Sequence, residues 1–144
     1  MQKQLIATFK ILIVSAILTL TLYFFFLVTD IFGHFYNAPL LLNIDFLANY
    51  QYINVIEELI IHFTITLTIV IVTTIVYKNF NNFKLLYLTL LMIAFILLYP
   101  LLITLSKRNF FHYDIKGYCI WIIAHLVFLI LLNISIKKLL TTNK

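Results

Sequence analysis

Long apolar runs separated by short polar stretches dominate the pattern of this chain. Four runs stand out, and they occupy residues 11–28, 56–77, 85–105 and 118–136. About 20 consecutive apolar residues in a helix span the hydrocarbon core of a bilayer. The pattern therefore predicts an all-α fold, a bundle of four transmembrane helices that forms a single integral membrane domain over residues 1–144.

The stretch between the first two runs, residues 29–55, is long for a connection within a bundle, and loops of this length are often functional. Asn37-Ala38-Pro39 predicts a turn within it. Residues 40–50 then place apolar side chains at helical spacing, with Asn43 and Asp45 off the apolar face. We expect a short amphipathic helix there, lying flat on the outer membrane interface.

Composition supports the membrane interpretation and excludes several classes of protein. Hydrophobic residues make up 64% of the chain and charged residues 10%, against about 45–50% and about 25% in soluble domains. A soluble globular enzyme and a disordered chain are both excluded by these values. The single cysteine, Cys119, leaves no intrachain disulfide and no thiolate metal cluster. No cofactor motif is present, because the two glycines do not form a phosphate-binding loop.

The net charge of +5 comes from basic residues at the ends of the apolar runs, where they indicate orientation and not nucleic-acid binding. No small-residue cleavage site follows the first run, so we expect that run to be retained as a helix. With both termini cytoplasmic, seven of the ten basic residues lie inside: Lys3, Lys10, Lys78, Lys84, Lys137, Lys138 and Lys144. All five acids then lie outside: Asp30, Asp45, Glu57, Glu58 and Asp114. A plasma-membrane protein with cytoplasmic termini is the predicted topology.

Ionisable residues within membrane segments are functional candidates by default, because they are costly to place there. Glu58 and His62 are four residues apart in the second run and therefore share a helix face. Trp121 and His125 have the same spacing in the fourth run. A rise of 1.5 Å per residue places both histidines at similar depth in the outer half of the bilayer. If these two helices pack together, Glu58, His62 and His125 form one polar cluster, which is our candidate functional site.

Three interpretations of this cluster stay open. The first is a proton relay, since histidine titrates near neutral pH. The second is a site for a divalent metal, since imidazole and carboxylate suit zinc. The third is a structural role, in which polar contacts hold the helices together. His34, His112 and Asp114 are secondary candidates that we expect to approach it from the loops. No metal motif such as HExxH occurs, so the metal is unknown. An activated nucleophile is also missing, which makes an enzyme the less favoured class.

The third run contains a proline, Pro100, directly after Tyr99. Proline removes one backbone hydrogen bond and bends a helix, which frees the carbonyl near Ile96. An ordinary kink is the favoured interpretation, since proline is common in membrane helices. Pro100 and Trp121 nevertheless count as secondary site candidates, because both lie near the depth of the histidines.

Three features of the second half carry a resemblance to a known group of proteins. They are the segment Asn79-Phe80-Asn81-Asn82-Phe83-Lys84-Leu85, the tripeptide Tyr99-Pro100-Leu101, and the segment from Trp121 to His125-Leu126-Val127. In these features the chain resembles the small bacterial inner-membrane proteins of the YqhR and YagU type. The resemblance implies a four-helix inner-membrane protein without established chemistry.

The predicted function is that of a small multi-pass plasma-membrane protein of a bacterium, an accessory or stress-related component with an acidic, histidine-containing outer face. The alternatives are a subunit of a proton-coupled or small-solute transport system, an immunity protein against a membrane-active toxin, and a membrane-embedded enzyme. Transport predicts polar residues through the whole bilayer, whereas the inner half offers few of them. The expected partners are the lipid bilayer and either another membrane protein or a second copy of this chain.

Overall fold

The computed structural model describes residues 2–44 and 54–141. Its elements, in chain order, are α1 (Gln2–Gly33), α2 (Asn37–Leu41), α3 (Val55–Asn79), the 3₁₀ turn η2 (Asn81–Phe83), α4 (Lys84–Leu105) and α5 (Ile115–Thr141). Four helices are long and apolar enough to cross a membrane. The predicted all-α four-helix bundle is confirmed, and the chain is a small multi-pass membrane protein.

The four long helices extend beyond the apolar runs at one or both ends. Their candidate membrane spans are Leu5–Gly33, Val55–Asn79, Asn81–Leu105 and Ile115–Leu140. Backbone polar groups in a bilayer must be satisfied within the segment itself, which a continuous helix achieves. Polar residues at the borders extend the hydrogen-bonded ladder without needing to be apolar. All ends of the four long helices except that of α4 at Leu105 therefore lie outside the apolar runs that predicted them.

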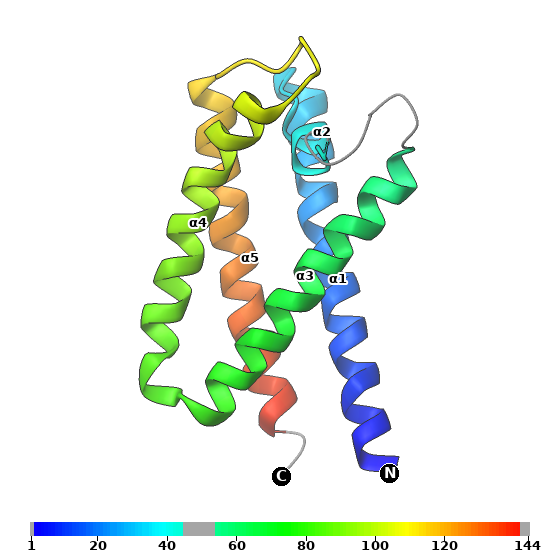
Figure 1. Cartoon of the computed structure of the whole chain (residues 1–144), viewed down its shortest axis with the longest axis vertical. Coiled ribbons are helices and arrows are strands. Elements are labelled where there is room, and N and C mark those ends of the chain that lie inside the picture. Colours follow the sequence, from blue (N-terminus) through cyan, green and yellow to red (C-terminus); the bar gives the residue numbers. More distant parts are fainter. Residues whose placement is uncertain (1, 45–53, 142–144) are drawn as a thin grey trace.

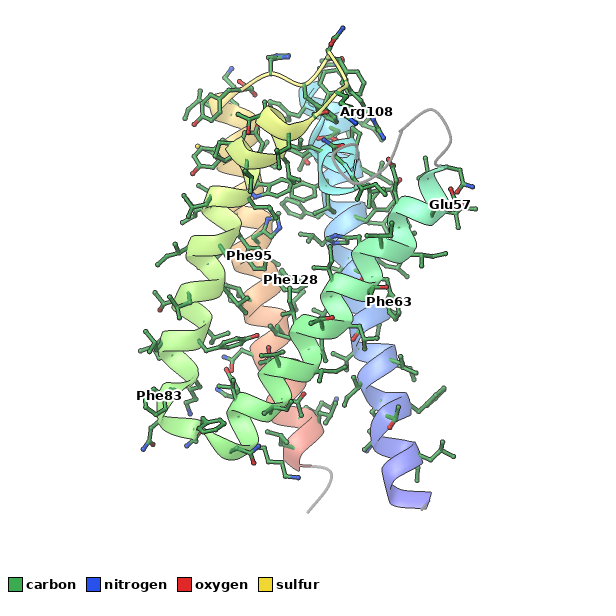
Figure 2. The ribbon with its side chains drawn as sticks, in the orientation of Figure 1. Glu57, Phe63, Phe83, Phe95, Arg108 and Phe128 are labelled. Carbon is green, nitrogen blue, oxygen red and sulfur yellow. The ribbon has the colours of Figure 1, made fainter. Side chains whose placement is uncertain are left out.

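The helices run so that both chain ends lie at one end of the bundle, here called the terminal end (Figure 1). The opposite end carries α2 and is called the α2 end. Helix α1 packs against α3 and α5, and α4 packs against α5. Helices α3 and α4 are joined through η2 at the terminal end and diverge toward the α2 end (Figure 1). Figure 2 shows the two ends through Phe83 and Arg108, which lie far apart.

Helix–helix packing, and not exclusion of apolar groups from water, holds this core together. Lipid tails are as apolar as the side chains, so close packing and hydrogen bonds supply the stability between membrane helices. Trp121 of α5 is fully buried and stacks on Phe26 of α1 with ring centroids 5.2 Å apart. Phe95 of α4 meets Phe128 of α5 edge-on at 5.8 Å, and both lie inside the bundle (Figure 2).

The loop after α1 contains a short helix, but its bounds and environment differ from the prediction. Helix α2 covers Asn37–Leu41 and is mostly buried, and the non-helical segment 42–44 that follows is buried as well. The expected turn at residues 37–39 is thus the start of this helix, where a proline is tolerated. The rest of the predicted amphipathic helix, residues 45–53, lies outside the described residues.

Long-range hydrogen bonds explain why α2 packs onto the bundle. The carboxylate of Asp30, on the last turns of α1, accepts a hydrogen bond from the Ala38 backbone N–H at 2.7 Å. The side-chain amide of Asn37 donates to the Gly117 carbonyl of α5 at 3.1 Å. These bonds fasten α2 to two long helices, so its side chains close the bundle instead of covering the membrane surface.

Candidate functional site

Glu58, His62 and His125 line one cavity of about 150 Å³ in the half of the bundle near α2. We call it the histidine cavity. Glu58 and His62 come from α3 and His125 from α5, two helices that pack together as the cluster hypothesis required. The apolar walls come from all four long helices and from the segment after α2. They include Leu22, Ile44, Ile65, Leu98 and Phe128.

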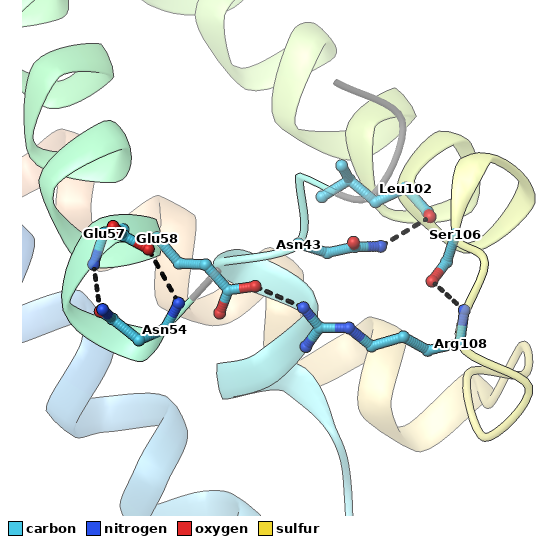
Figure 3. A network of polar contacts seen from close by, with 7 residues as sticks. All are labelled: Asn43, Asn54, Glu57, Glu58, Leu102, Ser106 and Arg108. Atoms are coloured by element: carbon cyan, nitrogen blue, oxygen red, sulfur yellow. Dashed lines mark hydrogen bonds and ion pairs between the residues drawn. The ribbon is translucent and has the colours of Figure 1, made fainter. Parts of the chain in front are cut away.

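Glu58 forms an ion pair with Arg108, which lies in the loop between α4 and α5. The guanidinium donates from Nη2 to Oε1 of the carboxylate, and the two side chains are 15% and 5% exposed. Figure 3 shows the pair joining α3 to this loop, with the Arg108 backbone N–H donating to Ser106 Oγ at 3.1 Å. The Glu58 carboxylate is therefore directed at Arg108 and not at the histidines.

His125 is 2% exposed and surrounded by aromatic rings. Its ring centroid lies 4.5 Å from those of Phe95 and Trp121. Nδ1 lies 2.8 Å from the Trp121 carbonyl oxygen. A carbonyl only accepts, so Nδ1 carries the hydrogen, and the neutral ring keeps a lone pair on Nε2. His125, which lines the cavity, thus keeps one hydrogen-bond acceptor, Nε2, on a ring whose other nitrogen is held.

His62 has an enclosed nitrogen with no partner. Its Nε2 is buried, and no hydrogen bond to it forms in the described structure. Buried polar side-chain atoms almost always have a partner from protein or water. A buried imidazole nitrogen without a protein partner at the wall of a cavity can form a hydrogen bond with a polar molecule inside that cavity, water included.

Among the described residues, the cavity is lined by two imidazoles and by one carboxylate that is already paired with a cation. Within residues 2–44 and 54–141, no group of three or more His, Cys, Asp or Glu side chains gathers in a metal-binding arrangement. Zinc sites in proteins use three or four protein ligands, and the Glu58 carboxylate is engaged with Arg108. The geometry is that of a small apolar site with two hydrogen-bonding groups.

His34, His112 and Asp114 do not join the histidine cavity, contrary to expectation. They line a second cavity of about 280 Å³ at the α2 end. His34 follows the last residue of α1 with a φ of 55°, and its N–H donates to the Asp30 carbonyl at 2.9 Å. His34 therefore has the left-handed backbone conformation that commonly ends a helix. The turn directs the chain toward α2 and away from the bundle interior.

Asp114 has a clear structural role as the N-cap of α5. Its carboxylate accepts from the Gly117 backbone N–H at 2.8 Å and from the Lys116 N–H at 3.4 Å. Its own carbonyl accepts the first bond of the helix, from Tyr118 N–H at 2.8 Å. Aspartate is among the preferred residues at this position, because it satisfies otherwise unpaired N–H groups.

The remaining candidates, Pro100 and Trp121, connect α4 to α5. Proline leaves the Ile96 carbonyl without its helical donor, and the Tyr118 hydroxyl donates to that carbonyl at 3.2 Å. The Trp121 indole N–H donates to the Phe95 carbonyl at 2.9 Å. Two side chains of α5 thus bind the α4 backbone about one turn before Pro100, and the Trp121 ring packs against the His125 ring.

Two tyrosines, Tyr77 and Tyr87, were missed by the sequence interpretation. The Tyr77 hydroxyl donates to Asn133 Oδ1 at 2.9 Å, and Thr73 Oγ1 donates to the Tyr87 hydroxyl at 3.2 Å. These bonds tie α3 to α5 and α4 between the histidine cavity and the terminal end. Tyr77 follows Thr73 at helical spacing on α3, so part of this signal was present in the sequence, whereas Tyr87 comes from α4.

Arg108 was also missed, because it was counted only as a charge that indicates orientation. A buried carboxylate in a membrane protein needs a cationic partner. Lys107, Arg108 and Lys116 are the three basic residues predicted on the same side as Glu58. Arginine is the residue best suited to a buried pair with a carboxylate. Arg108 could therefore have been predicted from the sequence as the partner of Glu58.

Comparisons with known proteins add no identification. The chain matches no family model, and no curated protein and no solved structure matches it. The resemblance to proteins of the YqhR and YagU type therefore stays a prediction. Function has to be inferred from the side chains themselves.

Proposed function

We propose that this protein is a non-catalytic accessory or stress-related component of a bacterial plasma membrane, and that its working site is the histidine cavity. The observation that carries the proposal is the buried, partnerless Nε2 of His62 in the same cavity as His125. Two imidazoles enclosed by apolar walls can bind a small hydrogen-bonding molecule. They lack the nucleophile and the orienting acid that acyl-transfer catalysis requires.

The distribution of charge supports cytoplasmic termini. The described residues near the terminal end include Lys10, Lys78, Lys84, Lys137 and Lys138, and no acid lies among the described residues there. The acids Asp30, Glu57, Glu58 and Asp114 all lie toward the α2 end. Cytoplasmic loops carry the excess of lysine and arginine. This orientation places the histidine cavity in the extracytoplasmic half of the membrane.

Packing on the terminal side of the cavity favours a closed binding site over a conduit for transport. Val70 of α3 and Leu132 of α5 are both fully buried. The bond between Tyr77 and Asn133 joins the same two helices on the terminal side of Val70. A molecule in the cavity would have to displace these side chains to continue toward the terminal end.

The proposed function is tested by the growth of a deletion strain across a range of external pH. We expect the strain to fail at one extreme of pH and wild type to restore growth, whereas His62→Ala and His125→Ala do not. His112→Ala is the matched control, because His112 is an exposed histidine outside the cavity. Expression of each variant is verified by blot. Full rescue by both cavity variants, or a deletion strain that grows like wild type, would contradict the proposal.

The proposed orientation predicts a labelling pattern for introduced cysteines. Cys119, the single cysteine of the chain, is first replaced by alanine. A membrane-impermeant maleimide is then expected to label Asn109→Cys, in the loop between α4 and α5, on intact cells. Asn82→Cys, in η2, is expected to react only after the cells are permeabilised. Both positions are exposed, and the reverse pattern would show that the termini are outside.

A further inference from the structure

We propose that the histidine cavity binds a membrane-dissolved amphiphile whose head group carries a hydroxyl, and that this molecule reaches the cavity from the bilayer between α3 and α4. This inference rests on the proposed function, since it names the class of ligand for the same site. Three features carry it: where the cavity opens, how its other sides are closed, and which hydrogen bond His125 requires.

The cavity reaches the lipid-facing surface between α3 and α4. Its walls on this side are Ile61, Ile65 and Ile69 of α3 with Leu98 and Leu102 of α4. Ile65 is 51% exposed although it lines the cavity, so the rim lies at the outer surface of the helix. The two helices diverge toward the α2 end (Figure 1). An opening with such an apolar rim suits a hydrocarbon chain and not an ion.

The side toward the α2 end is closed by polar contacts. The Asn43 side-chain amide donates to the Leu102 carbonyl at 3.4 Å, and Glu58 is held by Arg108. Figure 3 shows these contacts joining α3, the segment after α2 and the end of α4. Access from the aqueous phase would require these contacts to break, whereas access from the bilayer requires none of them to change.

The chemistry of His125 sets the class of head group. Because Nδ1 donates to the Trp121 carbonyl, Nε2 of the neutral ring is an acceptor, and a ligand that bonds to it brings a donor. Ketones, quinones and esters without a hydroxyl have no donor to offer this acceptor. A hydroxyl donates one hydrogen bond and accepts others, so it can also serve His62, whose Nε2 has no partner.

The size of the cavity indicates that most of the ligand stays outside. Its volume is about 150 Å³, whereas pockets for drug-sized molecules measure about 300–1,000 Å³. It accommodates a hydroxyl and a few carbons but not a complete lipid. The hydrocarbon tail therefore lies between α3 and α4 and extends into the bilayer, as expected for an amphiphile.

The test uses Trp121, the single tryptophan of the chain, as an internal reporter. Its ring centroid lies 4.5 Å from that of His125. The full-length protein in lipid nanodiscs is titrated with hexadecanol brominated near its hydroxyl end, and with the methyl ether of the same compound. We expect saturable quenching by the alcohol and roughly tenfold weaker binding of the ether, because the ether cannot donate to Nε2.

Two variants check that the signal comes from the cavity. His125→Phe removes the acceptor and is expected to abolish the difference between alcohol and ether. Thr64→Ala changes an exposed side chain of α3 outside the cavity and is expected to preserve that difference. Since His125→Phe risks misfolding, its helical content is compared with wild type by circular dichroism. The comparison of alcohol with ether on wild type needs no variant and decides the proposal by itself.

The outcomes separate this inference from the proposed function. Equal or non-saturable quenching by alcohol and ether overturns the hydroxyl amphiphile, even if the histidine variants fail to restore growth. Selective binding of the alcohol supports it, even if those variants restore growth and the proposed function is wrong. Competition with an unlabelled isoprenoid alcohol and with a diacylglycerol then shows which natural source of hydroxyl the site prefers.

Discussion

Replacement of Arg108 by methionine is expected to destabilise the folded protein by about 3–5 kcal/mol, because Glu58 is then left buried without a counter-charge. The Glu58 side chain is 5% exposed and Arg108 is its ion-pair partner. Removing one member of a buried pair costs more than the pair itself contributes, since the remaining charge has lost its hydration. The free energy of unfolding is measured in mild detergent by titration with sodium dodecyl sulfate, followed by Trp121 fluorescence.

The double variant Glu58→Leu/Arg108→Met tests this explanation. It removes both charges, so we expect it to recover most of the lost stability. Lys107→Met is the matched control: Lys107 is the exposed neighbour of Arg108, and its replacement is expected to change the unfolding free energy by less than about 0.5 kcal/mol. If Arg108→Met behaves like Lys107→Met, the ion pair does not bridge α3 and the loop in solution.

The four long helices could be predicted because the bilayer imposes both their length and their backbone hydrogen bonding. A run such as 85–105 has one structural solution in hydrocarbon, a continuous helix. No comparable constraint acts on the loop after α1. Its short helix lies where Asp30 binds the backbone of Ala38 and where Asn37 forms a hydrogen bond with Gly117 of α5. Helical spacing within residues 40–50 contains no information about those partners.

The candidate site could be predicted in part for a similar reason. Helical rise alone placed His62 and His125 at one depth, and the packing of α3 on α5 brings both to one cavity. Their hydrogen bonds were beyond prediction, because rise and periodicity do not determine rotamers. Glu58 is the example: it shares a helix face with His62 but pairs with Arg108, fifty positions away.

For the secondary candidates, the position along the sequence did not predict which cavity their side chains line. His112 and Asp114 precede α5 and were expected to reach inward, yet they line the cavity at the α2 end. The N-cap role of Asp114 fixes its carboxylate at the end of α5. An aspartate directly before a long helix is a recognisable capping signal, so its structural role was available from the sequence.

Replacement of Trp121 by alanine is expected to cost about 3 kcal/mol, the lower end of the range for a large buried aromatic residue. In soluble proteins part of this cost is transfer of apolar surface from water, and this part is small between membrane helices. The loss that remains is packing: Trp121 is fully buried, stacks on Phe26 at 5.2 Å and supports His125 at 4.5 Å. Because the reporter is removed, unfolding is followed by circular dichroism.

Two further variants separate packing from hydrogen bonding at this position. Trp121→Phe keeps a ring but loses the N–H that serves the Phe95 carbonyl, so we expect a cost of about 1–2 kcal/mol. Ile123→Ala is the matched control on the same helix, because Ile123 is more than half exposed on the lipid-facing side. Its replacement removes little contact between helices and is expected to have the smallest effect. Equal losses for Trp121→Ala and Ile123→Ala would show that the aromatic contacts of Trp121 neither hold α5 against α1 nor fix the ring of His125.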